Sequence, residues 1–370
     1  MPTRMVDGYF LGQMSGTSLD GIDTALTEIR GGKCILVETF SSCWPLDVQQ
    51  RLRKLIEYGD SLNEMLELDQ ICAMHFALAA QQCLSKTSLS TSDIVALGCH
   101  GQTIRHSPQS KPAYTLQIGA LSTISEITGI TTVGDFRSRD IAAGGQGAPL
   151  APAFHQAMFH DPDRKRVIVN IGGIANISIL TDKPLSGFDT GPGNRLMDDW
   201  ISQTKNEAFD NNGQFAASGS VISELLEALL KDPYFHAASP KSTGSDYFNL
   251  QWLGKHLTDF EDEPAENIQA TLASLTAITI SDQIILNTDH CDEVLVCGGG
   301  AQNSFLMQLI ERQLPGTKVS STQPFGIHPD WVEAMAFAWL AHRRLSGLPG
   351  NAANVTGAKG PRISGAIYPA

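Results

Sequence analysis

Several features that would assign a function quickly are absent from this sequence. Its seven cysteines include no Cys-x-x-Cys pair and no Cys/His cluster, which argues against a structural zinc site. No GxxxxGK[ST] segment occurs, so a Walker A loop is excluded, and the first predicted strand lacks the GxGxxG of a Rossmann dehydrogenase. No run of about 18 apolar residues and no charged leader before an apolar stretch is present, so we expect neither a membrane span nor a secretory signal.

Positive charge is also scarce. The chain carries 26 Lys and Arg against 39 Asp and Glu, a net charge of −13. This excess of negative charge disfavours non-specific binding to nucleic acid or to an anionic membrane. It does not exclude a nucleotide, because a phosphate site can be built locally from backbone N–H groups. The odd number of cysteines, with Cys72 and Cys83 inside a helical pattern, indicates buried thiols in a reducing cytoplasm.

The length of the chain predicts two lobes, because 370 residues exceed what one hydrophobic core ordinarily holds. Two parts of the chain begin alike, with a strand, a glycine-bearing turn and a second strand. They run from Gly12 to Ile29 and from Val167 to Leu180. We predict an N-terminal lobe of residues 1–132, on which the C-terminal helix 335–370 packs, and a C-terminal lobe of residues 133–334.

The first glycine-rich segment separates two predicted strands. Its ten residues, Gly12 to Gly21, contain three glycines, several small polar side chains and Asp20. A two-residue hairpin turn at Asp20-Gly21 is the simpler interpretation. Such a turn does not need ten residues of small and polar chemistry, however. We therefore predict a turn that surrounds phosphates.

The stretch from Val167 to Asn194 carries the strongest signal. A buried β-branched run turns at Gly172-Gly173 and returns as the second strand of a hairpin. After a short loop come Asp189, a Gly-Pro-Gly segment and an amphipathic pattern. This layout predicts an aspartate just ahead of a helix N-terminus, beside backbone that a ligand can approach. Phosphoryl transfer needs such a carboxylate as a base near donors for the phosphate. A helix N-cap is the alternative role of Asp189.

Four other segments are of interest. His100 and Gln102 follow a short predicted strand, where α/β proteins place ligand contacts, although a polar turn would look similar. Residues 134–150 are dense in charge and then in glycine, and we interpret them as a hinge and sugar-facing loop rather than a solvated connection. Arg137 is the best candidate for a ligand contact in this segment, because a guanidinium binds a carboxylate bidentately. Gly298 to Gly300 lies between a strand and a helix, as a nucleotide contact would. Pro240 to Gly244 is interpreted as a loop.

Seven motifs together point to one family. They are GQMSGTSLDGID (12–23), HGQTIRH (100–106), DFRSRDIAAGGQGAPL (135–150), NIGGIANIS (170–178), GFDTGPGN (187–194), PKSTG (240–244) and VCGGGAQN (296–303). In their order and across nearly the whole chain they closely resemble the motifs of anhydro-N-acetylmuramic acid kinases. The chain departs from the family at Ala120, where the family usually carries an aspartate or a similar polar residue.

The resemblance implies an α/β protein with the two-lobed actin-like ATPase (sugar kinase) fold. Each lobe would be a mixed sheet flanked by helices, with the active site in the interlobe cleft. The implied reaction uses ATP and Mg²⁺ to open 1,6-anhydro-N-acetylmuramic acid with water and to phosphorylate O6. Its products are N-acetylmuramic acid 6-phosphate and ADP, and it serves peptidoglycan recycling and amino-sugar catabolism. We expect a cytoplasmic homodimer that binds a small sugar and neither nucleic acid nor membrane.

The same resemblance implies a set of site residues. Asp189 would be the catalytic base, and Asp20 would lie close to Mg²⁺. The sugar would be held by His100, Gln102, Arg137, Asp140 and Glu333. The nucleotide would be bound by Gly12, Gln13, Met14, Ser15, Gly16, Thr17, Ser18, Leu19, Gly172, Gly173, Asn176, Gly298, Gly299 and Gly300.

Two rival functions remain open at this point. An ordinary hexose or amino-sugar kinase would share the fold and the aspartate base but would not use water as a nucleophile. An actin-like or chaperone-like ATP switch would need filament-forming surfaces or a separate peptide-binding domain. The 23 residues after Gly347 are too few for such a domain, which disfavours the switch.

Overall fold

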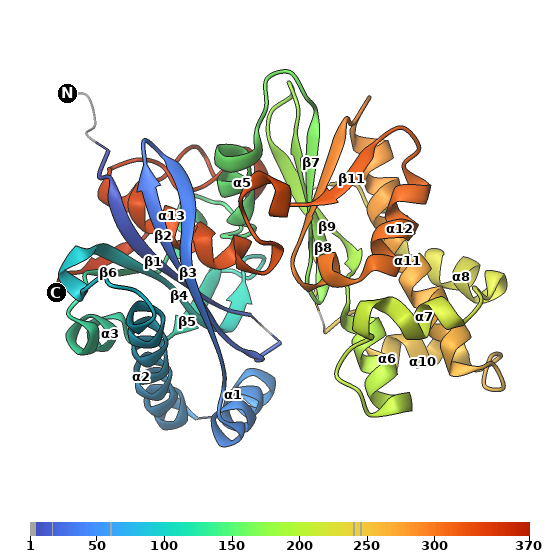
Figure 1. The fold of residues 1–370 in the computed structure, drawn as a ribbon. Helices are drawn as coiled ribbons and strands as arrows, with labels where there is room; N and C mark the ends of the chain where they lie inside the picture. The colour runs from blue at the N-terminus through green and yellow to red at the C-terminus, as the bar shows by residue number, and fades with distance from the viewer. Residues whose placement is uncertain (1–4, 17, 60, 240, 245) are drawn as a thin grey trace. The chain divides into compact units, whose positions relative to one another are not determined.

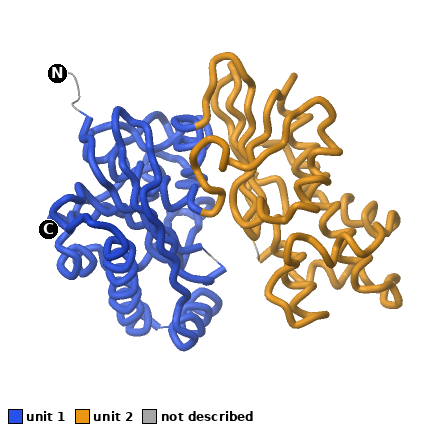
Figure 2. Tube along the Cα trace, viewed as in Figure 1, with its two compact units in different colours: residues 1–158, 331–370 blue, residues 159–330 orange. Residues whose placement is uncertain are grey.

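The computed structural model describes residues 5–16, 18–59, 61–239, 241–244 and 246–370. Two compact units divide the chain: Met1–Met158 with Trp331–Ala370, and Phe159–Asp330 (Figure 2). The sequence expectation placed the lobe boundaries after residues 132 and 334 instead. Compactness does not test which segments move together, so those lobes stay a prediction.

The first unit is built on a mixed sheet. Its strands are β1 Gly8–Ser15, β2 Gly21–Arg30, β3 Lys33–Cys43, β4 Ile94–Ser107, β5 Tyr114–Ile118, β6 Thr132–Gly134 and β12 Ala366–Tyr368. The order is β12-β6-β4-β1-β2-β3, with β5 paired to β4 (Figure 1). Strands β1, β4 and β6 are parallel to one another, and the other pairings are antiparallel.

Helices surround this sheet. They are α1 Leu46–Tyr58, α2 Leu62–Ser85, η1 Thr91–Asp93, α3 Leu121–Thr128, α4 Ser138–Ala142, α5 Ala151–Phe159, α13 Val332–Leu345 and α14 Ala353–Thr356, where η marks a 3₁₀ helix. The core contains Leu11, Leu26 and Leu97 from the strands and a buried stripe of α2 around Phe76. The stripe has the three-to-four-residue spacing that the sequence shows.

The second unit has its own mixed sheet. Its strands are β7 Arg166–Ile171, β8 Ile174–Leu180, β9 Ser186–Pro192, β10 Glu293–Cys297 and β11 Lys318–Ser321. The order is β11-β10-β7-β8-β9, so β9 is an edge strand. Strands β7, β10 and β11 are parallel, and β7, β8 and β9 form an antiparallel meander.

The helices of this unit gather around one long helix. They are α6 Arg195–Lys205, η2 Asn211–Gly213, α7 Gln214–Ser218, α8 Ser223–Leu230, α9 Pro233–His236, α10 Leu250–Leu257, α11 Ala265–Asn287, η3 Gly299–Gln302, α12 Ser304–Gln313, η4 Gln323–Phe325 and η5 Pro329–Trp331. Helix α11 is buried on most of its surface and packs on β8 and β9 and on α6, α7, α8 and α12. Within the described residues, no helix is both long and apolar enough to span a membrane.

Helix α13 lies directly against strands β1 and β4. Gly12 and Gly98 are register partners on these two parallel strands. A Cβ atom added to Gly12 would come within 2.0 Å of Ala334 O, and one added to Gly98 within 2.1 Å of Phe337 O. The two glycines therefore allow the backbone of α13 to pack closely on the sheet. A side chain at either position would displace the helix.

Three predicted boundaries are wrong in ways that affect the site. Strand β1 continues to Ser15, so the first turn begins at Gly16 and not at Gly12. Strand β4 extends to residue 107, so His100 and Gln102 lie inside a strand and not after one. Asp189 lies within β9, and α6 begins only at residue 195. In each case pairing with a neighbouring strand extends the β structure through residues that have weak β-propensity by themselves.

The contact between α13 and the sheet gives a stability prediction. Gly98→Ala should lower the free energy of unfolding by about 1–3 kcal/mol, because the new methyl group overpacks a backbone contact. Chemical denaturation of the purified variant measures this change.

A glycine in open space supplies the control. An added Cβ on Gly254 in α10 has no neighbour within 4 Å, so Gly254→Ala should stabilise its helix by about 0.5–1 kcal/mol. A Gly98→Ala variant as stable as the wild type would contradict the close packing of α13.

Candidate functional site

A row of polar side chains crosses the second sheet. Cys297 in β10, Asn170 in β7, Asn176 in β8 and Asp189 in β9 are register partners from each strand to the next. Directly paired residues project from the same face of a sheet, and their neighbours in sequence project from the other. The adjacent row through Ile177 belongs to the hydrophobic core. Asp189 therefore stands on the opposite face, beside Asn176.

Two glycine segments meet at one end of this row. Gly172-Gly173 joins β7 to β8, and Gly298 to Gly300 follows β10, the parallel neighbour of β7. Asn194 lies beside both: its side-chain amide donates to Ile171 O at 3.2 Å, and an added Cβ on Gly299 would lie 3.6 Å from its Nδ2. Backbone without side chains is thus available to a ligand at this point.

The glycines of these segments differ in how much space surrounds them. Gly172-Gly173 and Gly299 leave the space of a side chain open, because the nearest atoms to an added Cβ lie 3.6 Å or more away. An added Cβ would lie 2.5 Å from Asn170 Oδ1 at Gly298, and 2.4 Å from a β7 side chain at Gly300. Close packing alone therefore requires Gly298 and Gly300, while the first three remain free to approach a ligand.

The start of α6 differs from the expected anion site. The N–H groups of Asn194 and Arg195 donate to Gly172 O at 2.8 Å and to Gly173 O at 3.2 Å. These N–H groups hold the hairpin and are not available to a phosphate. Asn194 occupies the N-cap position of α6, so the alternative role of Asp189 as an N-cap is wrong.

Asp189 is held at one carboxylate oxygen. Its Oδ2 accepts from Thr243 N–H at 3.0 Å, and its Oδ1 has no partner among the residues that the structure describes. Burial raises the pKa of Asp189 to about 6, and the Thr243 hydrogen bond opposes this rise in part. The carboxylate is therefore ionised at neutral pH but more basic than a surface aspartate, as suits a general base.

In the first unit, a hydrogen-bonded group joins the end of β1 to the middle of β4. Ser15 and Gln102 are register partners and are buried. Ser15 Oγ lies 2.7 Å from Gln102 Oε1 and accepts from Trp44 Nε1 at 3.0 Å, while Gln102 Nε2 donates to Gly16 O at 3.2 Å. These side chains hold the turn that begins at Gly16. Trp44 was not predicted, because a lone tryptophan between a strand and a helix belongs to no motif.

Two members of the first segment belong to the interior of the unit. Gln13 is fully buried, and its amide donates to Phe76 O at 2.7 Å and to Thr24 Oγ1 at 3.1 Å. Leu19 is buried with φ at 62° and packs in the core. Both side chains pack behind the turn that was predicted to surround phosphates, so we expect no direct contact of these side chains with a nucleotide.

Three further residues of this segment, Met14, Ser18 and Asp20, lie at or near the surface. Ser18 Oγ donates to Asp20 Oδ2 at 2.7 Å, and both side chains are exposed. Met14 is half-buried. Thr17 lies outside the described residues. The exposed carboxylate of Asp20 therefore stands in the turn where the sequence places a metal contact.

Arg137 and His100 form a pair. Arg137 Nε and Nη2 lie 3.1 and 2.9 Å from His100 Nε2, and its Nη1 donates to Gly147 O at 2.8 Å. His100 Nδ1 lies 2.8 Å from Gly101 O, which requires a proton on Nδ1 and leaves Nε2 as the acceptor. Burial and the guanidinium lower the pKa of His100 well below its ordinary value. A neutral histidine thus orients the arginine.

Arg137 and Glu333 influence each other's pKa. Burial lowers the pKa of Arg137 to about 10, against the opposing effect of Glu333, so the guanidinium stays charged at neutral pH. Burial raises the pKa of Glu333, while Arg137 lowers it and Asp23 raises it further. Glu333 lies in the first turn of α13. The two side chains thus interact electrostatically within the first unit.

Asp140 has a structural role. Its side chain is fully buried, and its Oδ1 accepts from Asn351 Nδ2 at 2.6 Å and from Thr356 Oγ1 at 2.7 Å. Its Oδ2 accepts from Gly147 N–H at 2.8 Å. The carboxylate fastens the segment after Arg137 to the C-terminal part of the chain. We propose that Asp140 acts on a sugar only through this segment, because a direct contact would break these bonds.

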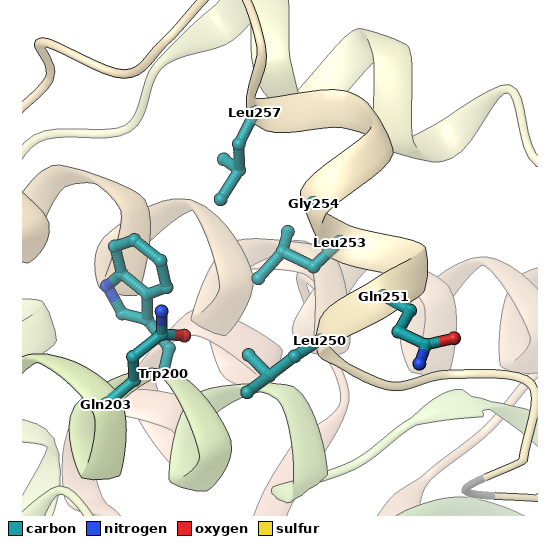
Figure 3. A pocket seen from close by; sticks show the side chains of 7 residues that line it. All are labelled: Trp200, Gln203, Leu250, Gln251, Leu253, Gly254 and Leu257. Carbon is teal, nitrogen blue, oxygen red and sulfur yellow. The ribbon is translucent and has the colours of Figure 1, made fainter.

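Grooves lined by described residues occur on the second unit. The groove in Figure 3, of about 340 Å³, is formed by α6 and α10 and is lined by Trp200, Gln203, Leu250, Gln251, Leu253, Gly254 and Leu257. It contains no candidate site residue. A groove of about 360 Å³ begins directly after Gly300 and is lined by Ala301, Gln302, Ser304, Met307, Gln308, Glu311, Val319 and Ser321. The second groove adjoins the candidate site.

A family model described as anhydro-N-acetylmuramic acid kinase matches residues 8–370 of the chain. The chain belongs to this family. It is therefore a phosphotransferase, and the resemblance of its motifs is confirmed. Asn194, which the sequence prediction left out of the site, closes the GFDTGPGN motif of the family resemblance.

Three solved structures resemble the chain, and we argue for the fold from the first of them alone. Component A of (R)-2-hydroxyglutaryl-CoA dehydratase from Acidaminococcus fermentans has a TM-score of 0.50 at 12% identity, covering 91% of this chain and 98% of that one. The activator of 2-hydroxyisocaproyl-CoA dehydratase from Clostridium difficile, with bound ADPNP, has 0.47 at 14%, covering 92% and 96%. A ROK family glucokinase from Streptomyces griseus, in complex with glucose and AMPPNP, has 0.40 at 14%, covering 90% and 98%.

At these identities a likeness concerns the fold alone. The match at a TM-score of 0.50 covers both units. Together with the two mixed sheets flanked by helices, it confirms the predicted α/β class of actin-like ATPases and sugar kinases.

The buried charge of Asp189 gives a prediction about stability. Its folded pKa of about 6 exceeds the ordinary value of 3.8, so the folded state holds a proton that the unfolded state releases between these pH values. The wild type should therefore lose stability relative to Asp189→Asn as pH rises through this window. We expect the variant to be more stable by about 1–3 kcal/mol at pH 8, with the difference shrinking towards pH 4.

Urea denaturation of both proteins across this pH range measures the difference. Asparagine keeps an acceptor for Thr243 N–H, so the comparison isolates the charge. If the free energy of unfolding of the wild type at pH 8 equals or exceeds that of the variant, burial of the Asp189 charge does not destabilise the fold.

Proposed function

We propose that this protein opens 1,6-anhydro-N-acetylmuramic acid with water and transfers the γ-phosphate of ATP to O6. The products are N-acetylmuramic acid 6-phosphate and ADP. The observation that carries the proposal is Asp189, a largely buried carboxylate with one oxygen held by Thr243 N–H and the other without a described partner. It stands in a polar row that ends at open glycine backbone. Family membership supplies the substrate class.

In the proposed reaction, Asp189 Oδ1 takes a proton from a water molecule. The water oxygen bonds to the anomeric carbon while the bond from that carbon to O6 breaks. The freed O6 then attacks the γ-phosphorus, and ADP leaves. One water is consumed, its oxygen becomes the anomeric hydroxyl, and its proton is on Asp189. The pKa of about 6 for Asp189 makes it a stronger base than an ordinary aspartate.

The open glycines support a nucleotide site. We propose that Gly172-Gly173 and Gly299, together with Asn176 and Asn194, contact the nucleotide from the second unit. The groove of about 360 Å³ that begins after Gly300 would take the adenosine. The turn from Gly16 to Leu19 would contact the β- and γ-phosphates from the first unit, held by the group around Ser15.

Asp20 fits a magnesium contact. Mg²⁺ is usually bound by one or two carboxylates together with substrate phosphates, and not by a cage of protein ligands. Within the described residues, no group of three or more His, Cys, Asp and Glu side chains suited to a metal occurs. The exposed carboxylate of Asp20 beside the turn has the chemistry that Mg²⁺ prefers. When bound, the ion would offset the negative charge of the phosphates.

Arg137 is the proposed contact of the lactyl carboxylate. Its guanidinium is oriented by His100 and by Gly147 O and keeps its charge. A fixed, charged guanidinium is suited to a carboxylate, which an ordinary hexose lacks. Glu333, which interacts electrostatically with Arg137, would orient a hydroxyl group of the sugar or the attacking water. Because the proposed sugar is a muramic acid, we propose a part in the recycling of peptidoglycan sugars. We also propose that the protein acts as a cytoplasmic homodimer.

Water labelled with ¹⁸O tests the reaction. Incubation with ATP and the anhydro sugar in labelled water should give a sugar phosphate that carries ¹⁸O at the anomeric hydroxyl and none in the phosphate group. Mass spectrometry of the intact product and of the released phosphate locates the label. An ordinary amino-sugar kinase would instead phosphorylate N-acetylglucosamine and leave the anhydro sugar closed.

Asp189→Asn is the matched control for this experiment. It should keep ATP binding and lose about 10²–10⁴-fold in kcat, because it removes the base and keeps the hydrogen bond to Thr243. More than about a tenth of the wild-type kcat in this variant would contradict the assigned role of Asp189.

A further inference from the structure

The backbone of Asp189 is held by a part of the chain that the proposed function does not use. Asp189 lies in β9, which is an edge strand, so one side of its backbone has no partner strand. Its N–H donates to Lys241 O at 3.1 Å, and its carbonyl accepts from Tyr234 Oη at 2.8 Å. Together with the bond from Thr243 N–H to Oδ2, these contacts replace the missing strand.

Lys241 connects the two pieces that make these contacts. Its Nζ donates to Tyr234 O at 2.9 Å and to Phe235 O at 3.2 Å, both in α9. The same Nζ lies 4.8 Å from the centroid of the Tyr234 ring, where a cation is attracted to the π-face. The described residues 241–244, which we call the strap, are thereby fastened to α9.

Helix α9 is itself anchored by Asp232. This carboxylate is 9% exposed and accepts from Tyr234 N–H and Trp252 Nε1, each at 2.9 Å, and from Tyr247 Oη at 3.0 Å. A carboxylate with three donors is a strong and well-oriented anchor. The chain of contacts thus runs from Asp232 through Tyr234 and the strap to Asp189.

We propose that Tyr234, Lys241 and Thr243 are positioning residues that fix Asp189 so that its Oδ1 remains open to the substrate. The proposal rests on the role of Asp189 as the base. None of the three residues touches a reacting atom in it. Without the strap, the edge strand could twist and Oδ2 would lose its only described donor, so the base would be misplaced and its charged form less stable.

The surroundings of Asp189 make its titration a suitable readout. Tyr234 from α9 is the titratable side chain that interacts with its charge. Strand β8 presents the neutral Asn176, and the strap presents Thr243 and Lys241, whose ammonium group bonds to α9. A change in the pKa of Asp189 therefore reports mainly on burial and on the Thr243 hydrogen bond.

Two variants that leave Asp189 intact test the proposal. Tyr234→Phe removes one hydroxyl group, and Lys241→Met removes the ammonium group at similar side-chain length. The carboxyl signal of Asp189 is followed by ¹³C NMR in the full-length protein labelled at aspartate, with Asp189→Asn for assignment. We expect each variant to raise the pKa of Asp189 by about one unit and to lower kcat about 10–100-fold, with the KM for ATP within about twofold of the wild type.

Two comparisons exclude a merely structural effect. Lys231→Met removes an exposed lysine at the end of α8 and should leave titration and kcat at wild-type values. Lys241→Arg keeps a charged donor and should recover most of the kcat lost in Lys241→Met. Variants that are less stable but show the wild-type titration and kcat would overturn the proposal.

The same data separate this proposal from the proposed function. If the titration shifts in both variants while kcat stays normal in them and in Asp189→Asn, the strap holds Asp189 but Asp189 is not the base. If kcat falls in Asp189→Asn while both strap variants behave as the wild type, the base is confirmed and the strap has no part in positioning it.

Discussion

One hydrogen bond, from Thr243 N–H to Asp189 Oδ2, sets the properties on which the proposed chemistry depends. Burial of Asp189 favours the neutral acid, and this single donor favours the anion. The balance leaves a carboxylate that is ionised at neutral pH and still basic. More donors would lower its pKa and make it a weaker base, and loss of this donor would raise its pKa further. The edge position of β9 allows this balance, because the contacts come from outside the sheet.

The glycines of the chain show why a glycine-rich motif is not one functional unit. Gly12 and Gly98 bring α13 onto the sheet, and Gly298 and Gly300 allow close packing against β7. Gly172-Gly173 and Gly299 leave space open. In a sequence these positions look alike. In the second unit, the close packing at Gly298 and Gly300 brings β10 and β7 together beside the open glycines. The open surface therefore depends on the packing of its neighbours.

Elements with a clear period were predictable from the sequence. The helical pattern around Cys72 and Cys83, and the strand and helix on either side of Gly298 to Gly300, were expected where the structure has them, since each depends on local patterns. The positions of Gly12, His100 and Asp189 within strands were not, because pairing with distant strands determines them. Asp140 has the same explanation: its donors Asn351 and Thr356 lie more than 200 residues further along the chain.

The sequence motifs of the candidate site could be predicted, but the long-range contacts that hold its residues could not. Asp189 and the two glycine turns follow from local sequence, whereas Trp44, Tyr234 and the strap act through contacts that no local pattern reveals. The pH dependence of kcat/KM for the anhydro sugar tests the central claim, that the partly buried Asp189 is the base. The account predicts an acid limb with a midpoint near pH 6. A midpoint near the ordinary aspartate value of 3.8, or no acid limb, would contradict it.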